Sequence, residues 1–163
     1  MVIPKEFDEI RPYTPEELPA AFDALLSDPQ FTAVVSQLFP GVGMDMIAAK
    51  LRSCKTNQQV QEVMIYDLIT KIENSCTDGV DMDCGCIEPD KRYTFVSNHR
   101  DIVLDSAFLS KKLIENHFPC TVEIAIGDNL LVYPWIRRLV RVNKSFIVQR
   151  SLQMREMLAS SAR

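Results

Sequence analysis

Residues capable of acid–base chemistry are concentrated in one short stretch of the chain. His99 follows a β-branched and aromatic run at 93–97, and two carboxylates, Asp101 and Asp105, come soon after it. A neutral imidazole can remove a proton near pH 7, and a partner on its second nitrogen fixes its orientation. The pattern predicts that His99 is a general base oriented by Asp101 or Asp105. The alternative is a histidine in a surface loop beside an aspartate that caps a helix.

The elements that must position these residues differ between the two parts of the chain. Residues 1–90 have the pattern of an acidic helical prefix. Its helices are expected at 14–26, 28–39, 44–53 and 56–72. Residues 91–163 alternate short apolar strands with helices. The strands are expected at 93–97, 121–126 and 145–148, and the helices at 102–118, 130–142 and 151–161.

This alternation predicts an α/β fold, with a parallel sheet and crossover helices preceded by the all-α helical prefix. A parallel sheet of three strands is narrow, and such sheets need cover on both faces and both edges. The sequence also stops after the last expected helix without a finishing strand. We therefore expect residues 91–163 to be the front part of a larger α/β domain.

Charge is distributed unevenly over the 163 residues, although the composition is that of an ordinary globular chain. Residues 1–90 hold 6 Lys and Arg against 16 Asp and Glu, a net charge of −10. Residues 91–163 hold 12 against 6, a net charge of +6. The basic part suggests an anionic partner, such as a phosphorylated small molecule, a lipid surface or nucleic acid.

Other sequence features bear on the cellular location of the protein and on metal binding. No apolar run approaches the ~20 residues of a membrane-spanning helix, and the start lacks the features of a signal peptide. Five irregularly spaced cysteines are typical of a reducing compartment, so we expect a cytoplasmic protein. Cys84-Gly-Cys86 is too closely spaced for structural zinc and lacks a fourth ligand, so no metal site is expected.

Two sequence blocks resemble a known family when they are taken together. Residues 98–105, Asn-His-Arg-Asp-Ile-Val-Leu-Asp, resemble the first block of the glycerolphosphate acyltransferase superfamily. Residues 145–150, Ser-Phe-Ile-Val-Gln-Arg, are similar to its second block, an apolar strand that ends in arginine. Residues 127–136 resemble the segment between the blocks. The resemblance covers about residues 93–155. The superfamily includes the glycerol-3-phosphate and 1-acylglycerol-3-phosphate acyltransferases.

The resemblance implies acyl transfer in phospholipid synthesis. His99 would take a proton from a glycerol hydroxyl, which attacks an acyl thioester of coenzyme A or acyl carrier protein. An aspartate would hold the imidazole, and Arg150 would bind the acceptor's phosphate. Asn98 and Arg100, in the first block, are expected to help bind substrate. The thioester is a co-substrate, and no cofactor is expected.

The sequence also departs from the family. Five residues separate His99 from Asp105 where the family has four, so either Asp105, through a bulge, or Asp101 could be the partner of His99. The third and fourth family blocks are absent, and we expect this chain to be inactive alone. A non-catalytic lipid- or phosphate-binding module, or an acyltransferase for another lipid acceptor, is the alternative.

A basic and aromatic segment at 130–144 lies between the two blocks. It could make a peripheral contact with an anionic membrane on the cytoplasmic face, with Trp and Tyr at the interface. It could equally be an amphipathic helix of the core with a solvated charged face. The expected partners are a small-molecule lipid precursor and this membrane surface. Nucleic acid is not expected, because the positive charge is local and no reader motif is present.

Overall fold

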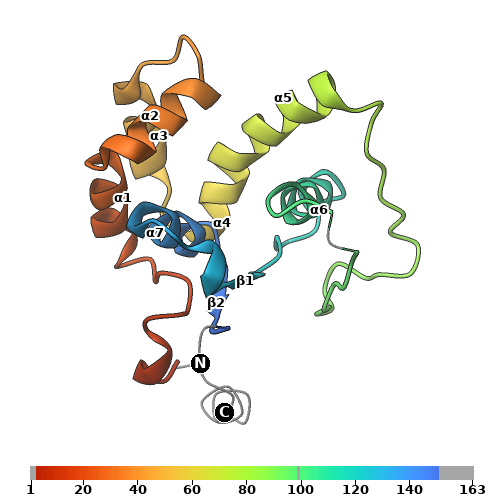
Figure 1. Ribbon diagram of the computed structural model, residues 1–163. Helices are drawn as coiled ribbons and strands as arrows, with labels where there is room; N and C mark the ends of the chain where they lie inside the picture. Colours follow the sequence, from red (N-terminus) through yellow and green to blue (C-terminus); the bar gives the residue numbers. More distant parts are fainter. Residues whose placement is uncertain (1–2, 99, 151–163) are drawn as a thin grey trace.

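The computed structural model describes residues 3–98 and 100–150 (Figure 1). Helices dominate the described part of the chain, and two short parallel strands form a small sheet. The coarse expectation of a mixed helix-and-strand fold that contains a parallel sheet is confirmed. The helix expected at 151–161 lies outside the described residues.

Three helices of the prefix form close to where the sequence predicts them, although the first begins at Leu18 and not at residue 14. These are α1 (Leu18–Leu26), α2 (Pro29–Leu38) and α3 (Met44–Ser53). The start of α2 shows the local cause, because the Asp28 carboxylate accepts hydrogen bonds from the amides of Gln30 and Phe31. Pro29 occupies the first helical position, where its missing N–H costs nothing.

The fourth expected helix is one continuous rod with an irregular middle. It consists of α4 (Asn57–Val60), the π-helical turn η2 (Gln61–Ile65) and α5 (Tyr66–Cys76). The Thr56 hydroxyl caps its start by accepting from the Gln59 amide. Within the π-helical turn, the buried Gln61 side chain donates a hydrogen bond to the backbone carbonyl of Asn143. The irregular turn therefore makes a contact with the back part of the chain.

The back part contains a βαβ unit. It comprises β1 (Ile124–Gly127), η3 (Asp128–Leu130), α7 (Pro134–Val142) and β2 (Ser145–Val148). The strands pair in parallel, with Ile124 opposite Ser145 and Gly127 opposite Val148. The strand expected at 145–148 is confirmed, and the one expected at 121–126 is displaced to Ile124–Gly127.

The helix expected at 102–118 is shorter than predicted, because its end is fixed by local hydrogen bonds. Helix α6 runs from Leu104 to Glu115. His117 follows with a positive φ of 60°. The amides of His117 and Phe118 donate back to the carbonyls of Ile114 and Leu113, which is the hydrogen-bond pattern of a Schellman motif.

The strand predicted at 93–97 is wrong for this structure, and the sheet has two strands rather than three. Residues 91–98 are all exposed, so the β-branched and aromatic side chains that predicted a strand are not buried on either side of the segment. Tyr93 and Phe95 instead contact each other, with ring centroids 6.3 Å apart. Cross-strand pairing and burial stabilise a strand, and this segment has neither.

The main hydrophobic core draws on both parts of the chain. Leu18, Phe22 and Leu25 of α1 are almost fully buried, and Val142 of α7 belongs to the same cluster. Trp135 and Leu139 of α7 pack against this cluster from its edge. Helix α7 of the back part is thus packed on the helices of the prefix, as Figure 1 shows for α1 and α7.

A buried arginine ties the residues before α1 to α7. Arg141 is 8% exposed, and its guanidinium donates hydrogen bonds to the backbone carbonyls of Asp8 and Arg11. The guanidinium also lies 4.0 Å from the centre of the Tyr13 ring, a cation–π contact. The carbonyl of Ile10 accepts from the Ile147 amide, so this segment also lies along β2. We call residues 8–13 the N-terminal strap.

Replacing Arg141 with methionine is expected to lower the free energy of unfolding by about 3 kcal/mol. The substitution keeps much of the apolar stem but leaves two partly buried carbonyls without their donors. Urea-induced unfolding followed by circular dichroism measures the change. Arg138→Met is the matched control, because Arg138 has no hydrogen bond or ion pair with any described residue, and less than ~0.5 kcal/mol is expected there. Equal losses in the two variants would contradict the anchoring role of Arg141.

Candidate functional site

The loop that leads into α6 is organised around the carboxylate of Asp105. His99 itself lies outside the described residues. One Asp105 oxygen, Oδ2, accepts hydrogen bonds from the amides of Arg100 at 2.9 Å and Asp101 at 3.1 Å. The Arg100 nitrogen belongs to the peptide bond that joins residues 99 and 100. The Asp105 carboxylate therefore closes the loop at Arg100 and Asp101, the two residues that follow the expected base in sequence.

Asp101 makes a different set of contacts. Its Oδ1 accepts from the amides of Val103 and Leu104, each at 2.8 Å. These amides belong to the first turn of α6, where N–H groups have no partner within the helix. Asp101 therefore acts as a cap for α6, whereas Asp105 closes the preceding loop. The two remaining residues of this expected site, Asn98 and Arg100, are exposed to solvent.

A network of two lysines and two glutamates holds α6 against α5. Lys111 is 4% exposed and lies 2.6 Å from Glu73, and it also pairs with Glu115. Lys112 is 2.9 Å from Glu73 and 2.8 Å from Glu115. Sequence analysis did not find this network. The spacing of Lys111 and Glu115 marks a pair within one helix, but nothing local indicates that Glu73 of α5 completes it.

The network shifts the pKa of each of its members. Hydrogen bonds from Lys111 and then Lys112 lower the pKa of Glu73 to about 2. Burial alone would lower the pKa of Lys111, but its hydrogen bonds to Glu115 and Glu73 outweigh burial and raise it. All four groups therefore stay charged at neutral pH. They hold one face of α6, the helix that contains Asp105, against α5.

Arg150 lies at the carboxyl end of the two parallel strands. Its backbone amide donates to the Asp128 carboxylate at 2.9 Å, which links the residues that follow β2 and β1. Its side chain is exposed, and its guanidinium has no hydrogen bond or ion pair with any described residue. In α/β sheets, ligands commonly bind at this end of the strands. Arg150 is therefore placed where an anion could reach it.

The structure groups the expected site residues in two places. Arg100 and Asp101 lie in the loop before α6, Asp105 lies in the first turn of α6, and Arg150 follows β2. Figure 1 shows the chain that enters α6 and the end of β2 in separate parts of the molecule. In this structure, therefore, the expected carboxylate partners of the base and the expected phosphate ligand are not side by side.

The basic segment at 130–144 uses several of its side chains internally. Trp135 packs against Phe31, with ring centroids 6.1 Å apart, and its indole N–H donates to the Gln30 side chain. Arg141 is buried against the N-terminal strap. These contacts favour the amphipathic core helix for α7. Val132 and Tyr133, which precede it, are 74% and 48% exposed.

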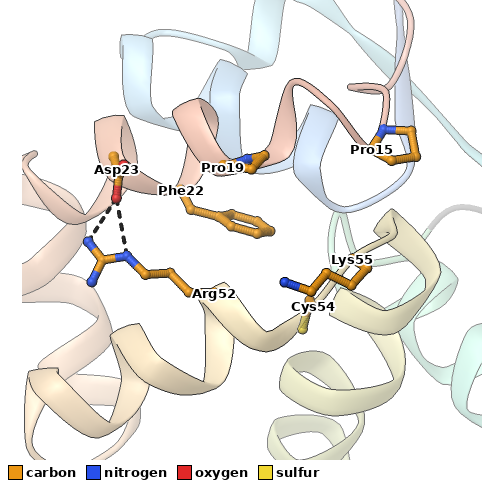
Figure 2. Close-up of a pocket in the computed structure, with 7 residues that line it drawn as sticks. All are labelled: Pro15, Pro19, Phe22, Asp23, Arg52, Cys54 and Lys55. Carbon is orange, nitrogen blue, oxygen red and sulfur yellow. Dashed lines mark hydrogen bonds and ion pairs between the residues drawn. The ribbon is translucent and has the colours of Figure 1, made fainter.

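A small pocket opens among the helices of the prefix (Figure 2). Its volume is about 210 Å³, and the Phe22 ring and the proline side chains of Pro15 and Pro19 supply its apolar wall. Arg52 at the rim donates to Asp23, and burial raises the pKa of the Cys54 thiol. The volume is below the ~300–1,000 Å³ of typical small-molecule sites. None of the site residues expected from the sequence lines this pocket.

Acid is expected to weaken the α5–α6 network through Glu73. Its pKa is about 2 in the folded chain and 4.5 ordinarily, so its contribution is present above pH 4.5 and is lost as the pH falls from 4.5 towards 2. Glu73→Gln should therefore be less stable at pH 7 and lose less stability over that range. Thermal unfolding at a series of pH values measures this.

The matched control is Glu123→Gln, because Glu123 is exposed and has no ion-pair partner among the described residues. Its stability should follow that of the unsubstituted chain at every pH. The same loss between pH 4.5 and 2 with and without Glu73 would contradict the assignment. Glu17 supplies a second acid-sensitive contribution, which both variants retain. Hydrogen bonds from Arg11 lower the pKa of Glu17 to about 2.

Among residues 3–98 and 100–150, no helix has the length and apolar character needed to cross a bilayer, and no group of three His, Cys, Asp or Glu side chains could hold a metal ion. Comparisons with protein-family models, with curated proteins and with solved structures found no match to this chain. The functional assignment therefore depends on the residues and their geometry.

Proposed function

We propose that this chain carries the front part of an acyltransferase that moves a fatty acyl group from a thioester to a glycerol-phosphate-type acceptor. The observation that carries the proposal is the position of Asp105. Its carboxylate accepts the amide that directly follows His99, at 2.9 Å. A general base needs a carboxylate that can orient its imidazole, and Asp105 is the carboxylate held at the residue that follows His99 in sequence. The resemblance of residues 98–105 and 145–150 to two acyltransferase blocks supports the same reaction.

The reaction needs one proton transfer in each direction. The imidazole of His99 takes the proton of the acceptor hydroxyl, and that oxygen attacks the thioester carbonyl carbon. The carbon–sulfur bond then breaks, and the proton on the imidazolium passes to the leaving thiolate. Asp105 stabilises the imidazolium and keeps the ring oriented. The acyl group of coenzyme A or acyl carrier protein is transferred without a covalent intermediate on the protein.

We take Asp105 as the partner of His99 because it accepts the amides of Arg100 and Asp101 in the loop that follows His99 in sequence. Both oxygen contacts of Asp101 described above go to the first turn of α6, which is the ordinary role of a capping aspartate. Asp105 instead faces the loop, where its contacts include the amide next to His99. The proposal takes the fold of this loop onto the Asp105 carboxylate as the means by which the extra residue between His99 and Asp105 is accommodated.

Arg150 is the proposed ligand of the acceptor's phosphate. A guanidinium binds phosphate through two parallel N–H donors, and Arg150 has no such partner among the described residues. One acceptor must contact both His99 and Arg150 during transfer. The proposal therefore requires the loop before α6 to approach the ends of the strands when the acceptor binds.

Peripheral membrane contact is a further part of the proposal. The exposed Val132 and Tyr133 stand beside the basic helix α7, and an aromatic and an apolar side chain of this kind can enter a lipid interface. Such contact would bring the chain to its lipid product on the cytoplasmic face.

Transfer is tested with radiolabelled acyl coenzyme A and either glycerol 3-phosphate or 1-acylglycerol 3-phosphate. The assay uses this chain and, where the reading frame continues beyond residue 163, the longer product. His99→Ala and Asp105→Asn are each expected to lower the rate by ~10²–10⁴-fold, the range for a general base and its partner. Asp101→Asn is the matched control and should lower it by less than tenfold, since it keeps an oxygen acceptor for the α6 amides.

The outcomes separate the candidate functions. A phosphate-free acceptor that is acylated as fast as glycerol 3-phosphate would remove the role of Arg150 and favour another lipid acceptor. If the longer protein binds glycerol 3-phosphate but shows no transfer that depends on His99, the proposed catalytic function is contradicted. That second result is the one expected of a non-catalytic phosphate-binding module.

A further inference from the structure

The two strand ends are joined by a contact that involves the backbone of Arg150. Gly127 is the last residue of β1, Asp128 follows it, and Arg150 lies two residues beyond β2. The Asp128 carboxylate accepts the Arg150 amide at 2.9 Å, across 22 residues of sequence. This hydrogen bond lies beyond the last residue pair of the sheet, Gly127 and Val148. It therefore continues the connection between the two strands after their pairing has ended.

Gly127 provides the space that the Arg150 side chain occupies. A Cβ atom on Gly127 would lie 3.1 Å from Cδ and 3.2 Å from Nε of Arg150. It would also lie 2.5 Å from Oδ1 of Asn129, closer than real Cβ contacts come. The φ of Gly127 is −72°, which any residue can adopt, so a side chain here would act by displacing the side chains of Arg150 and Asn129 and not by straining the backbone.

We infer that Asp128 and Gly127 are positioning residues for Arg150, holding its guanidinium at the carboxyl end of the strands to bind the phosphate of an acceptor. Asp128 fixes the backbone from which the side chain starts, and Gly127 leaves open the path along which its stem lies. The inference rests on the proposed function for the identity of the acceptor. The positioning itself depends only on these two contacts.

The charge of Asp128 separates positioning from direct ligand contact. A carboxylate near a bound phosphate repels it, so the charge of Asp128 cannot improve the affinity for an anion. What Asp128 contributes is an oxygen acceptor for the Arg150 amide. Asparagine retains that oxygen and removes the charge, whereas alanine removes both.

Binding of glycerol 3-phosphate to the 163-residue chain, measured by isothermal titration calorimetry, tests the role of Asp128. Arg150→Ala should weaken binding by at least tenfold, and Asp128→Ala by three- to tenfold. Asp128→Asn should bind at least as tightly as the unsubstituted chain. In the Arg150→Ala background, Asp128→Ala should cause no further loss, because a positioning residue acts only through the group that it positions.

The role of Gly127 is tested with a matched pair of glycine-to-alanine variants. Gly127→Ala should weaken glycerol 3-phosphate binding by three- to tenfold, because Arg150 and Asn129 must both move. Gly43→Ala is the control, since a Cβ there meets no atom within 4 Å and its φ is −65°. It should leave the affinity unchanged. Thermal unfolding of both variants shows whether each remains folded during the titration.

The failure of this inference differs from failure of the proposed function. Unchanged affinity in both Asp128→Ala and Gly127→Ala, with binding still dependent on Arg150, would overturn the inference and leave acyl transfer standing. Weaker binding in Asp128→Asn would also overturn it, since the charge would then matter. Absence of binding by the unsubstituted chain would overturn it as well. Binding by the 163-residue chain with the expected variant pattern, but no His99-dependent transfer by the longer product, would support the inference and contradict the proposed function.

Discussion

The buried guanidinium of Arg141 is the contact on which the arrangement of the chain depends. An unpaired buried charge is costly, so the carbonyls that receive the guanidinium must stay in place for as long as α7 is packed in the core. Those carbonyls belong to the N-terminal strap, and the same strap supplies the Ile10 carbonyl to β2. The Arg141 side chain thereby connects α7 to the N-terminal strap, and the strap in turn contacts β2.

The structure assigns different work to two carboxylates that look alike in sequence. Asp101 satisfies amides of the first turn of α6, and Asp105 satisfies amides of the loop before it. Helix α6 is itself held to α5 by charged groups, including a lysine that is almost fully buried. The position of Asp105 therefore depends on packing two turns further along the same helix and on a glutamate from another helix.

Local signals were sufficient for much of the fold. Asp28-Pro29 and Thr56 are helix starts that sequence rules recognise, and the strand at 145–148 has a bounded apolar pattern. The strand at 93–97 was mispredicted because its β-branched and aromatic residues satisfy a propensity, whereas a strand also needs a neighbour and a buried face. Glu73, Gly127 and Asp128 were missed because their roles depend on residues 22 or more positions away, which periodicity cannot detect.

The strap has a consequence for the order in which the chain can fold during synthesis. Arg11 and the residue that binds its carbonyl, Arg141, are 130 positions apart. At the usual ~5–20 residues per second, the strap emerges about 6 to 26 s before its partner has been made. Helices α1, α2 and α3 can form in that interval from local contacts, but the strap and the face of α1 that α7 covers stay without their final partners. The strap is therefore made well before Arg141 and is among the last segments of this sequence to reach its native contacts.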